Sequence, residues 1–214
     1  MSKYPIFLEL AGRRVVIVGG GTVAARKAEA VLKAGARLVV VAEKISDALR
    51  GLCAGTKSEL IEGKYTKDHL VGATLAIAAT DDEELNRRVY KDCQELEVLC
   101  NVVDSPGLCD FYVPAVVSRG ELQIAISTGG KSPAFSGHIR KKLEKIFTEK
   151  HGEFLVEIEQ LREHIIETIL DEIERKAMFG KIVDDESFDK FVQNGREQWR
   201  KDIEEMIKAH TVKR

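Results

Sequence analysis

The sequence predicts an α/β protein whose first half forms a parallel sheet and whose second half adds a β-hairpin and an all-helical end. Residues 15–18 are four consecutive β-branched residues that run straight into three glycines and an alanine-rich helical pattern. A second apolar strand follows at 38–42, which completes the order typical of a parallel βαβ unit. After residue 113 the alternation of strands and helices stops. We therefore expect a Rossmann-type parallel sheet that ends near this point.

The other elements follow from apolar runs, helical spacing and turn residues. The pattern predicts further strands at 59–62, 74–79 and 98–103, helices at 22–33, 45–52 and 83–96, and a turn or short helix at 66–70. Two strands, 111–117 and 122–127, flank the polar turn 118–121 and predict an antiparallel hairpin. A helix from 134 to about 149 is expected next.

The C-terminal part is predicted to be helical throughout. Apolar residues recur at helical spacing from Phe154 to Ile173 and again from Phe188 to Met206. Residues 178–181 are expected to separate these two segments, and the acids at 184–186 to open the second at the positive end of its helix dipole. These changes of pattern predict three domains, at 1–113, 114–148 and 149–214.

Composition excludes several classes of protein. A chain of 214 residues suits one or two domains, and its formal net charge of −2 argues against general nucleic-acid binding. The N-terminus lacks the features of a secretion signal, and no apolar run approaches the ~18 residues of a membrane span, so we expect a cytoplasmic protein. The four cysteines show no C-x-x-C pair or zinc-like spacing, which predicts reduced thiols and no bound metal.

The glycine-rich turn after residue 18 is the strongest single motif. Its spacing is Gly19-x-Gly21-x-x-Ala24, the variant with alanine in the third position. The first glycine permits the tight turn, the second lets the backbone approach phosphate oxygens, and the small Ala24 lets the helix lie close to the strand. Free N–H groups and the helix dipole then favour an anion. The motif and its context predict a bound dinucleotide.

Polar residues follow two of the other strands. Glu43 ends the second strand, where a dinucleotide fold places an acid on the adenosine ribose, and it would repel a 2′-phosphate. This favours NAD over NADP, although Lys44 argues the reverse. Thr80 and Asp81 lie where the cofactor is expected to pass, whereas Asp82 is expected to cap the following helix. The alternative for Glu43 is that it is only a solvated charge in a loop. The alternative for the acid pair Asp81 and Asp82 is that both only cap the helix.

Two further features lie outside the cofactor motif. Asp104 follows the fifth strand, just before a Pro-Gly turn, at the edge where parallel sheets bind ligands. The loop 127–133 combines hydroxyls and two glycines with Ser132 as a helix N-cap and Pro133 at the first helical position. This loop is interpreted either as a second anion site or as a plain capped loop.

Together these motifs resemble the precorrin-2 dehydrogenase family, whose module also forms the N-terminal part of bifunctional sirohaem synthases. The resemblance covers about residues 4–145 and rests on the stretches 5–10 (PIFLEL), 18–27 (VGGGTVAARK), 34–36 (AGA), 78–82 (AATDD), 101–104 (NVVD) and 127–133 (STGGKSP). No methyltransferase domain follows in the sequence, so the stand-alone form of this module is expected.

The resemblance implies dehydrogenation of precorrin-2 to sirohydrochlorin in sirohaem biosynthesis, with NAD as acceptor. Asp104 matches the family's essential aspartate and is expected to act as general base. Thr22 and Val23 match the phosphate-turn positions, and Glu43 and Lys44 match the ribose-side positions.

The resemblance also implies substrate contacts and an assembly. The loop 127–133 is expected to bind carboxylates of the tetrapyrrole, and Arg140 is a further ionic partner. The expected substrate-binding residues are Ser127, Thr128, Gly129, Gly130, Lys131 and His138. The family forms an intertwined homodimer through a central segment, which 114–148 matches.

Two functional questions stay open at this level. Some family members also insert ferrous iron into sirohydrochlorin, and the sequence permits this ferrochelatase activity, with Asp104 or His138 as the base. The alternative function is a regulatory NAD-sensing module without catalysis. Such a module would need neither an acid like Asp104 nor the second loop.

Overall fold

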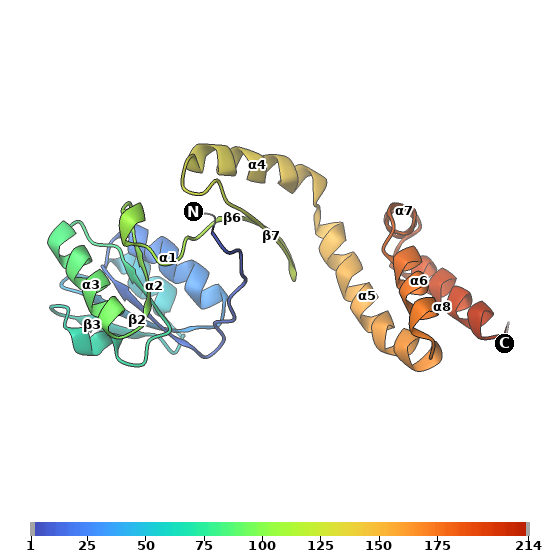
Figure 1. Cartoon of the computed structure of the whole chain (residues 1–214), viewed down its shortest axis with the longest axis horizontal. Helices are drawn as coiled ribbons and strands as arrows, with labels where there is room; N and C mark the ends of the chain where they lie inside the picture. The colour runs from blue at the N-terminus through green and yellow to red at the C-terminus, as the bar shows by residue number, and fades with distance from the viewer. Residues whose placement is uncertain (1–2, 213–214) are drawn as a thin grey trace. The chain divides into compact units, whose positions relative to one another are not determined.

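The chain folds into two units, Met1–Val113 and Pro114–Arg214, in a computed structural model that describes residues 3–212 (Figure 1). The first unit is α/β, and the second consists of a β-hairpin followed by helices. This confirms the predicted fold class. The division of the second unit at residue 148 stays a prediction.

A five-stranded parallel sheet forms the centre of the first unit, in the order β3-β2-β1-β4-β5. Its strands are β1 (Arg14–Val18), β2 (Arg37–Ala42), β3 (Glu59–Glu62), β4 (Leu75–Ala78) and β5 (Leu99–Val102). Strands β2 and β3 lie on one side of β1. Strands β4 and β5 lie on its other side. The carboxyl end of β1 therefore lies at the switch point, where sheets of this kind bind ligands.

Helices cover both faces of this sheet, because its strands are apolar on both sides. Val15 and Ile17 of β1 pack in one cluster with residues of α1 (Thr22–Lys33) and α2 (Asp47–Cys53). Val16 and Val18 point to the other face, toward α3 (Glu83–Glu95) and the 3₁₀ helix η1 (Lys67–Leu70). The four cysteines are free thiols; Cys53, Cys93 and Cys100 are buried and Cys109 is half-buried.

The second unit opens with the antiparallel hairpin of β6 (Ala115–Arg119) and β7 (Leu122–Ile126). The predicted turn 118–121 is wrong, because Ser118 and Arg119 pair with β7 and leave only two residues in the turn. The first strand also begins later than predicted. Helix α4 (Pro133–Ile146) follows, and the Ser132 hydroxyl accepts a hydrogen bond from the Phe135 backbone N–H at 3.2 Å, as its N-cap role predicts.

The helical end consists of α5 (Glu149–Thr168), α6 (Glu172–Ile182), α7 (Asp185–Asn194) and α8 (Arg196–Val212). The predicted break at 178–181 is wrong, since these residues lie inside α6. The chain instead turns at 169–171, where the Asp171 side chain accepts a hydrogen bond from the Glu174 N–H and starts α6. Asp184 caps α7 in the same way, so the predicted start of that helix is confirmed to within a residue.

A buried carboxylate joins α5 to α8 inside this bundle. The side chain of Glu157 is only 1% exposed, and its two oxygens lie 2.5 Å from nitrogens of Arg196 and Arg200. Both arginines reach water on their outer sides, so the charge of Glu157 is neutralised without burying a whole ion pair. The aromatic core beside it includes Trp199, whose indole N–H donates to the Ser187 hydroxyl at 2.9 Å.

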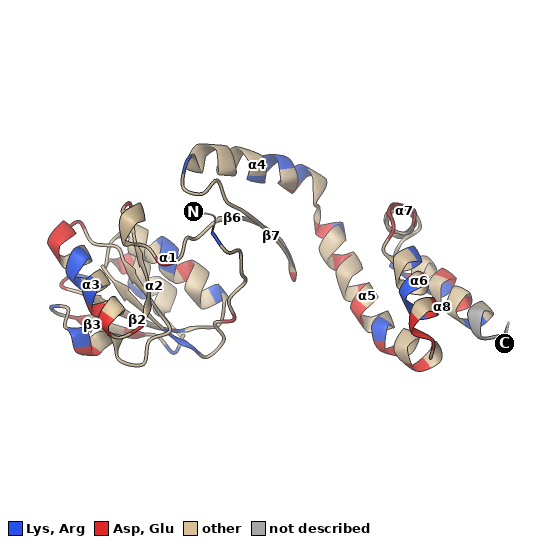
Figure 2. Cartoon of the chain, viewed as in Figure 1, with Lys and Arg blue, Asp and Glu red and all other residues tan. Residues whose placement is uncertain are grey.

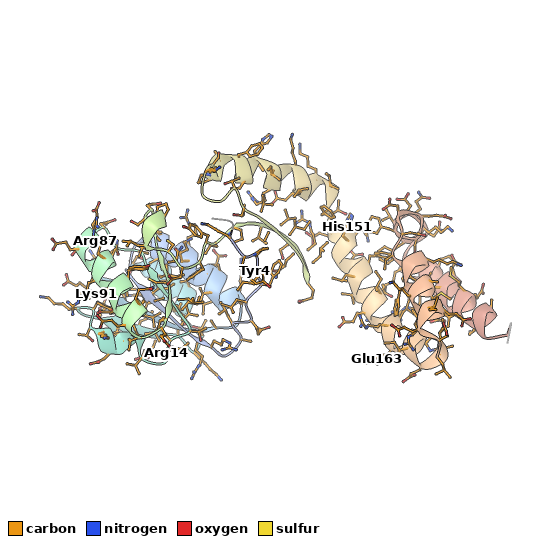
Figure 3. The ribbon with its side chains drawn as sticks, viewed as in Figure 1. Tyr4, Arg14, Arg87, Lys91, His151 and Glu163 are labelled. Carbon is orange, nitrogen blue, oxygen red and sulfur yellow. The ribbon has the colours of Figure 1, made fainter. Side chains whose placement is uncertain are left out.

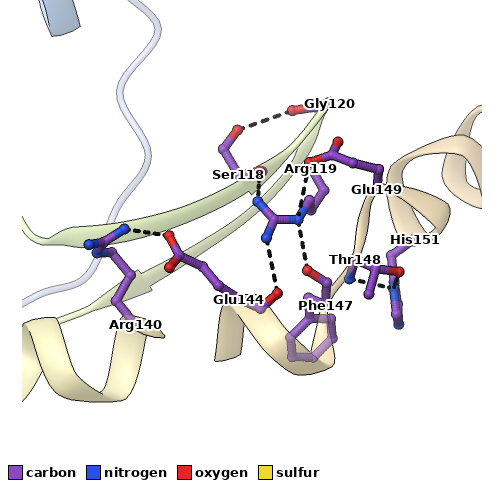
Figure 4. A network of polar contacts seen from close by, with 9 residues as sticks. All are labelled: Ser118, Arg119, Gly120, Arg140, Glu144, Phe147, Thr148, Glu149 and His151. Carbon is purple, nitrogen blue, oxygen red and sulfur yellow. Dashed lines mark hydrogen bonds and ion pairs between the residues drawn. The ribbon is translucent and has the colours of Figure 1, made fainter. Parts of the chain in front are cut away.

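Arg119 fixes the hairpin to the joint between α4 and α5 (Figure 4). Its guanidinium donates to the carbonyl oxygens of Phe147 at 2.7 Å and Glu144 at 3.1 Å, which are the unpaired acceptors at the end of α4. Its Nε also lies 3.4 Å from a Glu149 carboxylate oxygen in the first turn of α5. Gly152 then lets α5 lie directly against the backbone of Arg119, because a Cβ on Gly152 would collide with the Arg119 carbonyl oxygen.

Substitution of two helical glycines in this unit is predicted to have effects of opposite sign. Gly152→Ala forces α5 away from the hairpin and should lower the free energy of unfolding by about 1–3 kcal/mol. In Gly180→Ala, in α6, the new methyl group meets no atom within 4 Å, so the substitution should raise the free energy of unfolding by up to ~1 kcal/mol through helix propensity. Trp199, the chain's only tryptophan, reports on the unit by fluorescence during urea unfolding. Equal effects of the two variants would contradict the packing described for Gly152.

Candidate dinucleotide-binding site

The glycine turn after β1 is packed so closely that side chains are excluded from it. The Gly19 N–H donates to the Val41 carbonyl at 2.9 Å, and Gly19 has φ of 130°, a conformation that other residues rarely adopt. A Cβ on Gly19 would collide with the Ala79 carbonyl, and one on Gly20 with the Lys44 carbonyl. A Cβ on Gly21 would meet no protein atom within 4 Å. Gly21 therefore leaves its space open on the ligand side.

A cavity of about 1100 Å³ lies over this turn. It is lined by residues that follow β1, β2, β3 and β4 and by the first turns of α3. Eight of the nine predicted cofactor residues line it: Gly19, Gly21, Thr22, Val23, Glu43, Lys44, Thr80 and Asp81. The ninth, Ala24, is a residue of α1 that is fully buried against the sheet, where its small side chain lets the helix lie close to the strand.

Thr80 is held in place at the end of β4. Its hydroxyl donates to Asn86 Oδ1 at 2.8 Å, and the Asn86 amide donates back to the Thr80 carbonyl at 2.9 Å. Asp82 accepts a hydrogen bond from the Leu85 N–H at 3.0 Å, so its predicted capping role is confirmed. Asp81 is exposed and lines the cavity.

The sequence did not predict the part of the cavity that lies beyond Glu43 and Lys44. Gly63, Lys64 and Tyr65 come from the segment after β3, and Leu85 and Arg88 come from α3. The signal for the first group was its position after a strand at the carboxyl edge of the sheet. No local pattern indicates the α3 residues, because helix packing across the sheet brings them to the cavity.

Asp104 follows β5 in the first unit and has φ of 60°, a left-handed conformation that is uncommon outside glycine. The loop that carries it folds back onto β5. Buried Asn101 donates to the Phe111 carbonyl at 2.9 Å, and the Cys109 thiol donates to the carbonyls of Val102 and Ser105 at 3.2 and 3.3 Å. The Asp104 side chain is thereby presented to solvent from a fixed backbone.

A lysine on α1 lies near Asp104. Lys27 is half-buried, and desolvation together with the nearby Arg26 lowers its pKa. The negative charge of Asp104 acts in the opposite direction and raises it. The two side chains are thus close enough to interact electrostatically.

The predicted substrate loop belongs to the second unit. Gly129 and Gly130 have φ of 65° and 84°, so both need glycine's freedom. The Thr128 hydroxyl accepts from the Ser132 N–H at 3.2 Å and donates to the Ser132 carbonyl at 3.1 Å. The Ser127 hydroxyl accepts from the Gly129 N–H at 3.1 Å. These side chains therefore shape the loop itself.

The cations around this loop differ in their availability. Lys131 and His138 are exposed, whereas Arg140 forms an ion pair with Glu144 on the same helix (Figure 4). Lysines and arginines give the C-terminal half of α4 a basic character (Figure 2). Within residues 3–212, no cluster of three or more His, Cys, Asp or Glu side chains is placed to hold a metal ion, and no helix is long and apolar enough to cross a membrane.

Comparison with known proteins agrees with this site. The family described as "Putative NAD(P)-binding" matches residues 6–115, and the one described as "Sirohaem biosynthesis protein central" matches 119–146. The solved structure of "SirC, precorrin-2 dehydrogenase" aligns with a TM-score of 0.81 and 26% identity, covering 97% of this chain and 100% of that one. The chain belongs to the precorrin-2 dehydrogenase and sirohaem synthase N-terminal module family. Its first unit is accordingly an NAD(P)-binding domain.

Curated relatives of this family are longer proteins. The chain is 41% identical to the "Siroheme synthase" of Psychrobacter arcticus over 152 residues, which are 71% of this chain and 28% of that protein. It is 35% identical to that of Photorhabdus laumondii over 208 residues, which are 97% of this chain and 44% of that protein. The chain thus spans less than half the length of these two relatives.

Gly21→Ala is predicted to weaken dinucleotide binding without unfolding the protein. The new methyl group meets no protein atom but occupies the space where the backbone approaches phosphate oxygens. We expect NAD affinity, measured by calorimetry, to fall at least tenfold while the melting temperature of the ligand-free protein is unchanged. Gly20→Ala is the matched comparison, because its Cβ collides with the Lys44 carbonyl and should lower the melting temperature. Wild-type NAD affinity in Gly21→Ala would contradict the assignment of this turn.

Proposed function

We propose that this protein oxidises precorrin-2 to sirohydrochlorin with NAD as hydride acceptor, as a step of sirohaem biosynthesis. The observation that carries the proposal is the likeness to "SirC, precorrin-2 dehydrogenase", which extends over nearly the whole of both chains and therefore includes both units. The open glycine turn and the cavity above it supply the dinucleotide site that such a reaction needs.

The ribose end of the cavity supports NAD as the cofactor. Glu43 lines the cavity directly after β2, where its carboxylate can accept hydrogen bonds from ribose hydroxyls. The same charge repels a 2′-phosphate. Lys44 and Lys64 also line the cavity and weaken this discrimination, so a modest preference for NAD is expected.

Asp104 is proposed as the general base. NAD held at the glycine turn would supply the hydride acceptor, and dehydrogenation of the tetrapyrrole also releases a proton, which the Asp104 carboxylate can take. The fixed loop after β5 holds this carboxylate at the carboxyl edge of the sheet, where the positive charge of Lys27 is near enough to interact with it.

The loop 127–133 is proposed to bind the substrate's carboxylates. Its two glycines allow the turn that leads into α4, and Lys131 and His138 add exposed polar or charged groups. Ser127 and Thr128 contribute by holding the loop in shape. Arg140 is a weaker candidate than the sequence indicated, because Glu144 already pairs with it.

Asp104→Asn is predicted to lose precorrin-2 oxidation by at least 100-fold and to keep NAD affinity. Asparagine tolerates the left-handed backbone of this position but cannot accept the proton. The measurement is the absorbance change from precorrin-2 to sirohydrochlorin with NAD present, alongside calorimetry for NAD. Asp68→Asn, an exposed aspartate in η1 outside the cavity, serves as the control.

The same assay separates the competing functions. Full turnover by Asp104→Asn would overturn the general-base assignment. A wild-type protein that binds NAD but does not oxidise precorrin-2 would favour the regulatory sensor. Adding ferrous ion to sirohydrochlorin, with and without the protein, measures whether this chain also inserts iron.

A homodimer is proposed as the working assembly. The sheet of β6 and β7 has only two strands, although α4 and α5 pack against it within the chain. Its two strands also leave outer edges that can pair with another chain. Sedimentation should therefore give twice the chain mass of 23.8 kDa. A mass of one chain at micromolar concentration would contradict the dimer.

A further inference from the structure

The cofactor cavity has an end to which neither the motif nor the family resemblance assigns a role. Gly63–Tyr65 follow β3, the outermost strand on the β2 side of the sheet. A dinucleotide with its pyrophosphate at the β1 turn and its ribose at Glu43 extends its base toward this side. Asp104 follows β5, at the opposite edge. The adenine end is therefore the end where Tyr65, Leu85 and Arg88 line the cavity.

Tyr65 and Asp92 hold Arg88 in this position. The buried Tyr65 donates its hydroxyl to Asp92 Oδ2 at 3.0 Å, and its ring lies 5.9 Å from the Arg88 guanidinium carbon. Arg88 Nε lies 3.9 Å from the same Asp92 oxygen. Burial and the hydrogen bond to Asp92 raise the pKa of Tyr65, so the hydroxyl stays a neutral donor. The guanidinium is thus oriented by a ring on one side and a carboxylate on another.

The chemistry of this end suits a flat aromatic base. Arg88 keeps 61% of its side chain exposed while it lines the cavity, so its guanidinium is accessible to a ligand. Guanidinium planes stack on aromatic rings, and Leu85 adds an apolar wall one helical turn away. Lys44 and Lys64 are point charges on flexible stems and lack this planar surface.

We propose that Arg88 stacks on the adenine ring of the bound dinucleotide, with Tyr65 and Asp92 as its positioning residues. The inference rests on the proposed NAD site and adds a residue that recognises the base. It assigns the recognition of adenine to helix α3. This helix packs on one face of the sheet, whereas α1, which follows the phosphate turn, packs on the other.

The test compares ligands with and without adenine by calorimetry. Arg88→Ala should weaken ADP-ribose and NAD about tenfold, as expected for loss of one base-stacking contact. Its affinity for nicotinamide mononucleotide, which lacks adenine, should be unchanged. Arg87→Ala is the matched control: it changes the same residue type one position away, and the Arg87 side chain is 68% exposed, pairs with Glu83 and extends outward from α3 (Figure 3). It should bind all three ligands like the wild type.

Tyr65→Phe tests the positioning role. It keeps the ring but removes the hydrogen bond to Asp92, so it should weaken only the adenine-containing ligands, and less than Arg88→Ala does. Combined with Arg88→Ala it should add no further loss, because it acts through Arg88. An equal loss for nicotinamide mononucleotide would show a general structural role and overturn this part.

Three results would overturn the main inference. Wild-type affinity of Arg88→Ala for ADP-ribose excludes the stacking contact. A loss confined to NADP, with NAD unchanged, assigns Arg88 to a 2′-phosphate. Failure of the wild-type protein to bind either NAD or ADP-ribose removes the cofactor site itself, and this outcome is separate because it is measured before any variant is made.

Discussion

The close approach of the β1 turn to its neighbours is the constraint on which the rest of the first unit depends. The backbone at Gly19 and Gly20 lies against the carbonyls of Ala79 and Lys44. Ala79 follows β4, and Lys44 lies in the loop after β2. Three strand ends thus meet without intervening side chains. Because this contact brings the loops after β2 and β4 to the same turn, it also creates the walls of the cavity above it.

The strand order then distributes the chemistry along the edge of the sheet. Residues after β2 and β3 form one end of the cavity, the glycine turn after β1 forms its middle, and Asp104 follows β5 at the far edge. A cofactor that spans this edge places its adenine and its reactive end at opposite sides of β1. The proposed roles of Arg88 and Asp104 are therefore separated by the topology, which is why substitutions of the two residues can be expected to affect binding and turnover independently.

Local signals in the sequence were sufficient wherever one short segment determines the structure. The glycine turn, the cap at Asp82 and the cap at Ser132 each depend on residues within four positions. The helical end was harder, because Gly180 suggested a break but sits within α6, while the real turn at 169–171 was hidden by a continuous apolar stripe. The position of Tyr65 after a strand was a usable signal, but Arg88 could not be found, because it reaches Tyr65 only through packing of α3 on one face of the sheet.

The spacing between Asn101 and Asp104 has a physical reason in this fold. Asn101 lies in β5 with its amide turned into the protein, where it binds the returning loop at Phe111. Asp104 comes three residues later, after the strand has ended, and adopts a left-handed backbone that lets the loop reverse direction. The buried amide thus fixes the loop, and the loop carries the exposed carboxylate on a defined stretch of backbone at the end of β5.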